Sequence, residues 1–274
     1  MRLPRLLAAL AALPLALLPA TAGSAAPPSP ATYLALGDSV AAGVGAPSGL
    51  GYVPLLAADL AESRHCGQGQ ALGCRLETDN RSVGGATTVS LVNGQLPGAL
   101  ELLEERNGNR TPVDDVRLIT ITIGGNDVFN PVIGACAGGV GAACQTTVAR
   151  QFTQVSTNYA TILGELRAAA GPATTIAVMT YYNPLPVPGC KYSALTELGG
   201  LVLEGGGPLA FGLNDVIRQQ AAAFGAVVVE TGSVVDSTEV QPDCLHPNAE
   251  GHADIAQAFF DATSASVVGG PGRR

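Results

Sequence analysis

The sequence predicts an α/β fold, a three-layer sandwich in which helices cover both faces of a central parallel sheet of about five strands. Short runs of apolar residues, many of them β-branched, alternate along the chain with longer segments of helical periodicity. This alternation is typical of parallel sheets with helical connections. The runs are continuously apolar rather than alternately polar and apolar, as expected of strands that are buried on both faces.

Five segments are expected to form the strands. The clearest is 116–123 (VRLITITI), and the poorest is 79–83, which is rich in polar residues. In chain order the expected strands are 32–36, 79–83, 116–123, 175–180 and 226–230. In an open sheet of this kind the ligand site lies beyond the carboxyl ends of the strands, so the residues that follow each strand are the candidates for function.

Helices are expected between the strands, with glycine-rich loops at 134–141 and 205–207. One helix contains Pro97, which is tolerated only near a helix start. Another is stopped by Gly171, and the last begins after Asn248, a common N-cap residue. The expected helices are 51–62, 96–106, 148–170, 208–224 and 248–264.

The N-terminus has the composition of a secretory signal. Arg2 and Arg5 precede an apolar run at 6–18, and small residues follow at 20–26. This is the order of regions in a cleaved signal peptide. The alternative is an uncleaved anchor, but the run is short for a membrane span and contains Pro14.

We therefore expect a signal peptide at 1–26, cleaved between Ala22 and Ala26, and a single domain at 27–274 with its core at about 32–264. The formal net charge is −8, and Lys191 is the only lysine. Nucleic acid is an improbable partner for such a chain. Loss of two arginines with the signal changes the charge to about −10, which favours a monomer without stable membrane insertion, secreted from the cell.

Six cysteines follow the expected signal peptide. An even number in an exported chain indicates disulfides, although six cysteines allow 15 pairings. Closure of short loops favours Cys66–Cys74 and Cys136–Cys144, which leaves Cys190–Cys244 as a long-range bridge. A zinc site is the alternative, but no pair has the C-x-x-C spacing of zinc ligands, and we expect no metal.

Two strand ends carry candidate catalytic side chains. After the first strand, Gly37 allows a tight exit, and the Ser39 hydroxyl would then be exposed with its own N–H free to bind an anion. After the third strand, Asn126 offers a side-chain amide, which is the donor that a developing oxyanion needs. Each has a simpler alternative: Ser39 as a helix N-cap, and Asn126 in an Asx-turn.

The other two candidates are a glycine pair and a histidine. Gly84 and Gly85 follow the second strand and would expose a backbone N–H as a second oxyanion donor, unless they form a plain turn. After the last strand, Asp243 precedes His246 by three positions, so the carboxylate would orient an imidazole whose other nitrogen faces the site. A surface histidine before a helix is the alternative.

Two further histidines are not candidates. His252 falls in the first turn of the last helix and is expected to be neutral and structural, and His65 is expected to be exposed. Signals for other enzyme classes are absent from the sequence: a complete dinucleotide fingerprint, a P-loop lysine and a G-x-S-x-G elbow. A glycosidase carboxylate pair stays open, because separation along the sequence does not give distance.

Taken in order along the chain, these motifs resemble the SGNH (GDSL-type) hydrolase family over about 33–262, and most closely its secreted actinobacterial lipase/esterase branch with three disulfides. Val40 stands where the family name has Leu. The resemblance implies a flavodoxin-like fold and a cofactor-free site: Ser39 is the nucleophile, Asp243 and His246 complete the triad, and the oxyanion hole comprises the Ser39 N–H, Gly85 and Asn126. We choose Gly85 over Gly84 because alanine and threonine follow it, as in many relatives.

The implied activity is that of a serine esterase or lipase acting through an acyl-enzyme. The absence of tryptophan favours lipid or simple acyl esters over acetylated carbohydrates, although four tyrosines offer rings for sugar stacking: Tyr52, Tyr181, Tyr182 and Tyr192. Leu185, Val187 and 201–203 are expected to line an acyl pocket. The alternatives are a carbohydrate acetylesterase, an acyltransferase on the same site, and a non-catalytic exported binding module.

Overall fold

The computed structural model describes residues 30–63, 76–109, 111–112 and 114–268. The expected signal peptide, His65 and the predicted Cys66–Cys74 bridge lie outside these ranges. Within them, no helix combines the length and the apolar composition needed to cross a membrane.

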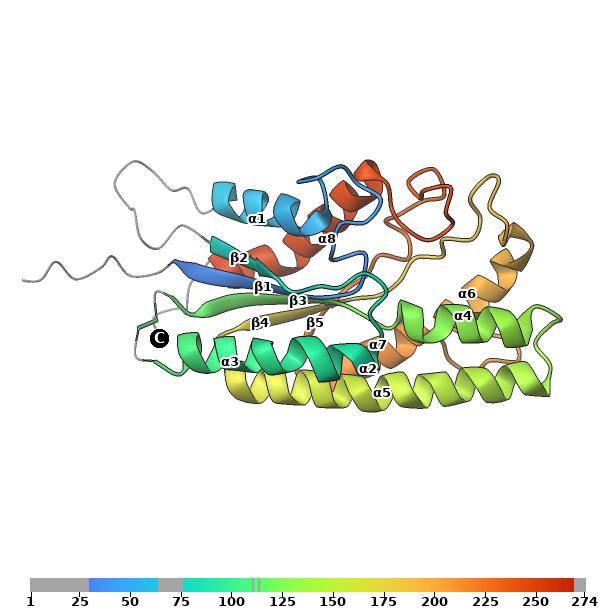
Figure 1. Cartoon of the computed structure of the whole chain (residues 1–274), viewed down its shortest axis with the longest axis horizontal. Helices are drawn as coiled ribbons and strands as arrows, with labels where there is room; N and C mark the ends of the chain where they lie inside the picture. Colours follow the sequence, from blue (N-terminus) through green and yellow to red (C-terminus); the bar gives the residue numbers. More distant parts are fainter. Residues whose placement is uncertain (1–29, 64–75, 110, 113, 269–274) are drawn as a thin grey trace, which may run out of the picture.

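A five-stranded parallel sheet forms the centre of the fold, as predicted (Figure 1). The strand order is β2-β1-β3-β4-β5, so β1, β3 and β4 are interior strands and β2 and β5 are edges. The strands are β1 (Ala31–Gly37), β2 (Leu76–Asn80), β3 (Val116–Thr122), β4 (Thr175–Met179) and β5 (Val227–Val229). All neighbouring pairs are parallel, which places the carboxyl ends of all five strands at one edge.

The second strand lies three residues earlier than predicted. The prediction was 79–83, but β2 ends at Asn80. Beyond Asn80 the chain forms no strand. It still runs beside β1, because the N–H groups of Arg81 and Val83 donate to the carbonyls of Ala35 and Gly37. β2 is an edge strand with partly exposed polar side chains, so its sequence lacks the apolar run that marks a buried strand.

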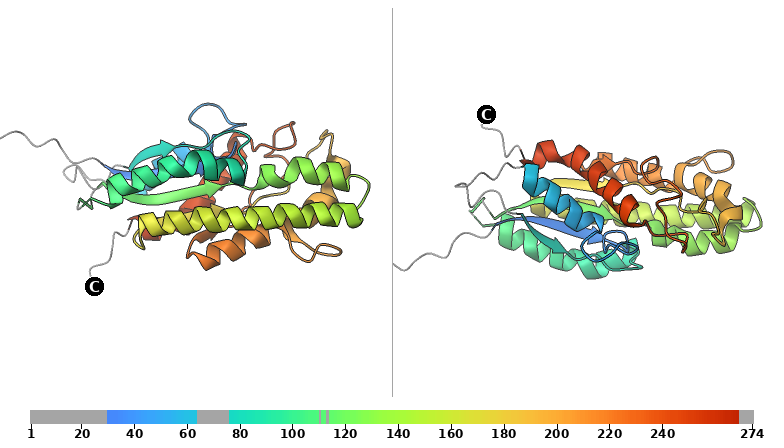
Figure 2. Two further views of the ribbon diagram at one scale, coloured as in Figure 1. Left: turned by 60° about the horizontal axis from the view of Figure 1, so that its bottom comes forward. Right: turned by 90° about the horizontal axis from the view of Figure 1, so that it is seen from above.

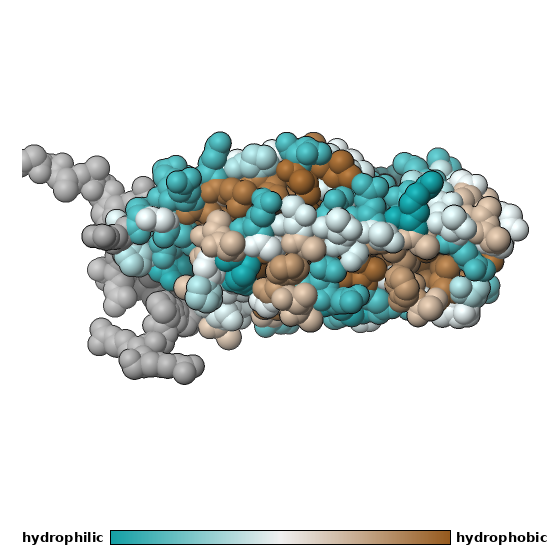
Figure 3. All heavy atoms as spheres, turned by 90° about the horizontal axis from the view of Figure 1, so that it is seen from below, coloured by the Kyte–Doolittle hydropathy of each residue, from teal (hydrophilic) through white to brown (hydrophobic). Residues whose placement is uncertain are grey.

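Helices cover both faces of the sheet. On one face α1 (Tyr52–Ser63) lies beside α8 (Ala249–Val268), and the rings of Tyr52 and Phe259 stack at 4.9 Å (Figure 2). On the other face α5 (Ala142–Ala170) lies between α3 (Leu96–Asn107) and α7 (Leu213–Ala223). The outer face of this second layer carries hydrophobic residues separated by hydrophilic ones (Figure 3).

Several predicted helix boundaries were wrong. α5 begins at Ala142, six residues before the predicted start, and α7 begins at Leu213, not at 208. α7 starts late because the backbone N–H groups of Gly206 and Leu209 each donate to the other residue's carbonyl, which closes a tight turn just before the helix.

Two longer helices were not predicted, and both lie beyond the carboxyl edge of the sheet (Figure 1). They are α4 (Gly125–Cys136) and α6 (Thr196–Glu204). α4 contains Pro131, and it includes the start of the predicted 134–141 loop. Glycine and proline in α4 concealed its helical pattern, and these two helices form much of the wall around the candidate site.

Candidate active site

Ser39 lies in the turn that follows β1. The strand exits at Gly37, where φ is +143° and an added Cβ would come within 2.3 Å of the Thr122 carbonyl oxygen of β3. Only glycine therefore allows this close passage between the two central strands. The turn leaves Ser39 at the carboxyl edge of the sheet with 8% of its surface exposed.

A second loop brings His246 to Ser39. His246 Nε2 lies 2.8 Å from Ser39 Oγ, so the hydroxyl can donate its proton to the imidazole. The loops pack so closely that a Cβ on Gly45, downstream of Ser39, would lie 2.1 Å from the Pro247 carbonyl oxygen. Gln241 Nε2 also donates to the Gly45 carbonyl. The two segments, more than 200 residues apart in sequence, are thus held together beside the hydroxyl–imidazole contact.

Asp243 orients the imidazole from its other side. Its Oδ2 lies 2.6 Å from His246 Nδ1, and its Oδ1 accepts the backbone N–H groups of Leu245 and His246 at 2.9 and 3.0 Å. Partial burial raises the pKa of Asp243, but the hydrogen bonds from His246 lower the pKa further, to below its usual value. The carboxylate is therefore ionised at neutral pH and fixes the tautomer with Nδ1 protonated.

Asn126 lies in the first turn of α4, after β3. Its Nδ2 donates to the Ala86 carbonyl at 2.9 Å, which uses one of two amide hydrogens and leaves the other for a ligand. Gly85 precedes Ala86 in a turn closed by the Ala86 N–H and the Val83 carbonyl, and its φ is +78°. This hydrogen bond therefore holds the Asn126 side chain against the glycine turn. The choice of Gly85 over Gly84 stays a prediction.

Asp127 was not singled out from the sequence. Its two carboxylate oxygens accept the N–H and the hydroxyl of Thr88 at 2.8 and 2.6 Å, which joins the start of α4 to the short helix α2 (Thr88–Ser90). Its position beside Asn126 was visible in the sequence, but its partner was not. The contact keeps Asn126 next to the glycine turn.

An apolar groove opens beside Ser39 and His246. It has a volume of about 780 Å³ including the part open to solvent. α4, α6 and the segment after β4 supply its apolar wall: Val128, Phe129, Val132, Ile133, Tyr181, Tyr182, Leu185, Leu198, Val202 and Leu203. Leu185 lines it as predicted, and so do Val202 and Leu203 of the predicted 201–203 segment, whereas Val187 and Leu201 do not.

The tyrosines are poorly placed to stack on sugars. Tyr52 is fully buried between α1 and α8, so the proposed stacking role is wrong for this residue. Tyr181 and Tyr182 border the groove but are only 8% and 3% exposed. Tyr192 packs edge-on against Phe129 at 5.7 Å.

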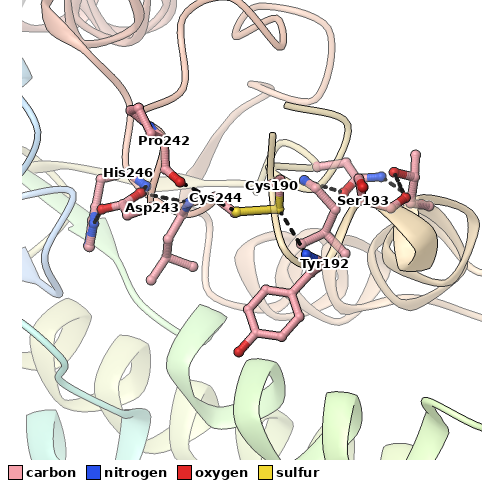
Figure 4. Close-up of a disulfide and its surroundings, with 11 residues drawn as sticks. Cys190, Tyr192, Ser193, Pro242, Asp243, Cys244 and His246 are labelled. Atoms are coloured by element: carbon pink, nitrogen blue, oxygen red, sulfur yellow. Dashed lines mark hydrogen bonds and ion pairs between the residues drawn. A yellow bond between two sulfur atoms is a disulfide. The ribbon is translucent and has the colours of Figure 1, made fainter. Parts of the chain in front are cut away.

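Two disulfides brace the site. Cys136–Cys144 joins the end of α4 to α5. Cys190–Cys244 joins the loop after β4 to the loop that carries Asp243 and His246 (Figure 4). Both pairs are those predicted. Cys244 has a φ of +62°, unusual for a residue with a side chain, so the loop is held in a conformation that needs external support.

His252 has the structural role that was expected. It is buried, its Nδ1 accepts the Tyr52 N–H at 3.3 Å, and its Nε2 donates to the Val44 carbonyl at 3.0 Å. Burial lowers the pKa of His252, which keeps the ring neutral at physiological pH.

The geometry is that of a serine-type hydrolase: a hydroxyl, an imidazole and a carboxylate in hydrogen-bonded sequence beside an amide donor. The model of the GDSL-like Lipase/Acylhydrolase family matches residues 35–253, and the chain belongs to this family. It is therefore an enzyme, a carboxylic ester hydrolase. No curated protein sequence matches the chain.

Solved structures share the fold at low sequence identity. The lipase Lip_vut3 from a goat rumen metagenome has a TM-score of 0.62 at 20% identity, covering 85% of this chain and 98% of that one. The extracellular lipase of Streptomyces rimosus has a TM-score of 0.57 at 19% identity, covering 85% and 100%. Phospholipase A1 of Streptomyces albidoflavus NA297 has a TM-score of 0.52 at 21% identity, covering 86% and 100%.

Proposed function

We propose that the protein hydrolyses esters of apolar acyl groups at Ser39 through an acyl-enzyme. The observation that carries this proposal is the hydrogen-bonded chain from Ser39 Oγ through His246 to Asp243, which faces a groove with apolar walls. A serine that only capped a helix, or a histidine that was only a surface residue, would not form this chain, in which His246 lies 2.8 Å from Ser39 Oγ and 2.6 Å from Asp243 Oδ2.

The steps follow from the geometry. His246 Nε2 takes the Ser39 proton while Ser39 Oγ attacks the ester carbonyl carbon. The oxyanion that forms is held by the N–H groups of Ser39 and Gly85 and by the amide of Asn126. His246 then protonates the leaving alcohol, and water repeats the sequence to release the acid and restore the Ser39 hydroxyl.

Substitution of the nucleophile tests this assignment. Purified Ser39→Ala should lose ester hydrolysis and labelling by a fluorophosphonate probe, because the covalent route disappears. Ser233→Ala, which changes an exposed serine outside the site, should keep both. Ordinary activity in Ser39→Ala would refute the proposal, and an unlabelled parent protein would favour the non-catalytic binding module.

The groove favours acyl chains over acetyl groups as substrates. An acetyl group would leave most of the apolar wall in contact with water, whereas each buried methylene contributes about 0.8 kcal/mol. The shared folds do not choose between the two, because fold alone does not determine substrate. The protein's natural ester is therefore expected to be a lipid or another ester with an extended acyl group, and water rather than an added alcohol is expected to be the acceptor.

Export accompanies this function. We infer that residues 1–26 are a signal peptide that is removed on export. Residues 27–274 then form one secreted, monomeric hydrolase domain of the actinobacterial branch. The disulfides Cys136–Cys144 and Cys190–Cys244 support an oxidising compartment, since such bonds seldom persist in the cytosol.

A further inference from the structure

A buried carboxyl group beside the nucleophile has no part in the triad. Asp38 directly precedes Ser39 and is 2% exposed. Its Oδ1 accepts the Val40 N–H at 3.0 Å and the Thr122 hydroxyl at 3.2 Å, and its Oδ2 accepts the Tyr181 hydroxyl. All three partners are donors, which is the environment of an ionised carboxylate.

Tyr181 extends this contact to the oxyanion side of the site. Its hydroxyl donates to Asp38 Oδ2. Its ring packs so closely on Gly125 that an added Cβ would lie 2.9 Å from a ring carbon. Gly125 directly precedes Asn126, just as Asp38 directly precedes Ser39.

The backbone of Tyr181 is fixed in its turn. Its N–H donates to Asn214 Oδ1 and its carbonyl accepts from Asn214 Nδ2, both at 2.8 Å. Asn214 is fully buried at the start of α7. One phenol on a rigid support therefore bridges the turns after β1 and β3, which carry the nucleophile and the amide donor.

We propose that Asp38 and Tyr181 are a positioning pair, which sets the placement of Asn126 relative to Ser39 so that the amide meets the oxyanion when it forms. Neither side chain reacts with the substrate. This inference rests on the proposed function, since it assigns a role in the same reaction. Misplacement of catalytic groups by about 1 Å costs up to about a hundredfold in rate, so a contact that fixes two turns is important for catalysis.

Ionisation of Asp38 couples this pair to pH. The titratable groups that face it are His246 and four tyrosines: Tyr52, Tyr159, Tyr181 and Tyr182. Burial raises the pKa of every one of these tyrosines, so they stay neutral and His246 alone can carry a charge. Burial raises the pKa of Asp38 to about 6, against the lowering effect of its hydrogen bonds and His246.

The elevated pKa of Asp38 distinguishes a positioning role from a stabilising one. The folded-state pKa of about 6 exceeds the ordinary 3.8, so the folded state holds the proton more tightly than the unfolded state, and stability from this group falls as pH rises from about 4 to 6. Above pH 6 the ionised carboxylate opposes folding. Stability at neutral pH therefore does not account for a carboxyl group at this position next to Ser39.

Tyr181→Phe, Asp38→Asn and the double variant test the pair on a short, soluble p-nitrophenyl ester. Each single variant should lower kcat by about tenfold to a hundredfold, with KM changed by less than about threefold. The double variant should lose no more than about the larger single loss, because both changes break one contact. At pH 8 the melting temperature of Asp38→Asn should equal or exceed that of the parent.

The pH profile gives an independent measurement. Protonation of Asp38 should contribute to the fall of parent activity in acid, whereas Asp38→Asn should lack this contribution and decline less steeply. Tyr33→Phe is the matched control, since it removes a buried tyrosine hydroxyl that bonds Thr120 and neither Asp38 nor Tyr181. It should lower stability and leave kcat unchanged.

Several outcomes would overturn the pair. They are an unchanged kcat in either single variant, losses that multiply in the double variant, a loss confined to KM, or an unchanged acid limb in Asp38→Asn. The proposed function fails separately, through activity that survives in Ser39→Ala. If Ser39→Ala is inactive while Tyr181→Phe keeps full kcat, the positioning role alone is refuted.

Discussion

At the scale of single residues, one substitution at Asn126 tests its proposed place in the oxyanion hole. Its amide donates to the Ala86 carbonyl and has a second hydrogen available for the oxyanion. Asn126→Ala removes both. Loss of one such donor typically costs roughly 10²–10³ in kcat, and we expect a loss in that range with little change in KM, because a ground-state ester carbonyl binds the donor weakly.

Steady-state kinetics on a soluble ester would measure this effect. Asn93→Ala is the control, since Asn93 is an exposed asparagine whose amide bonds the Val89 carbonyl on the helical segment after the glycine turn. It should keep full kcat. A loss below about threefold in Asn126→Ala would remove Asn126 from the oxyanion hole.

The sequence predicted the placement of the residues whose position depends on a strand end. Ser39 and Asn126 lie two and four residues beyond β1 and β3, and the carboxyl ends of parallel strands meet at one edge. Tyr181 lies two residues beyond β4, so the same rule pointed to it, but the sequence proposed sugar stacking instead. Its hydrogen bond to Asp38 and its packing on Gly125 join three separate segments, and no local pattern reveals such contacts.

At the scale of elements, α6 controls the size of the groove. Val202 and Leu203 are buried on its inner side, and Glu197 is exposed on the same helix. Val202→Phe would fill part of the groove. With p-nitrophenyl esters from acetate to octanoate, we expect parent kcat/KM to rise with chain length, and Val202→Phe to lose about tenfold or more on octanoate while acetate hydrolysis is retained.

Glu197→Phe adds the same ring at the exposed position and should change neither end of the series. Phospholipid and an acetylated glycan, assayed beside the esters, extend the comparison to natural classes. A parent enzyme that prefers acetate and the glycan would overturn the lipid assignment and favour the carbohydrate acetylesterase. Release of a new ester when an alcohol is added would favour the acyltransferase.

Elements were predicted well where their sequence pattern decides their structure, and poorly where packing decides it. Pro97 lies at the second residue of α3, near its start as expected, but helical structure also precedes it and runs unbroken from Thr88 to Asn107. A π-helix (Leu91–Gln95) precedes the proline, and the Leu96 N–H donates to the Leu91 carbonyl, five residues back. This wider turn accommodates a residue that has no N–H and would otherwise break the helix, which local propensity does not indicate.

At the scale of the whole molecule, the two described disulfides close loops of very different length. Cys136 and Cys144 are 8 residues apart, whereas Cys190 and Cys244 are 54 residues apart. Chain-entropy arguments then assign about 2.5 kcal/mol of stabilisation to the first and about 4 kcal/mol to the second. The second also adjoins Asp243 and holds Cys244 at its positive φ.

Paired cysteine-to-serine variants would measure these contributions. The Cys136→Ser/Cys144→Ser variant should melt a few degrees lower and keep its kcat on a short ester, because the bridge lies at the far end of α4 from Asn126. The Cys190→Ser/Cys244→Ser variant should melt lower still and lose kcat, because the loop that aligns His246 with Ser39 is released. Equal losses of kcat in both variants would show that the bridges act only through overall stability; unchanged melting in both would exclude their contribution to the fold.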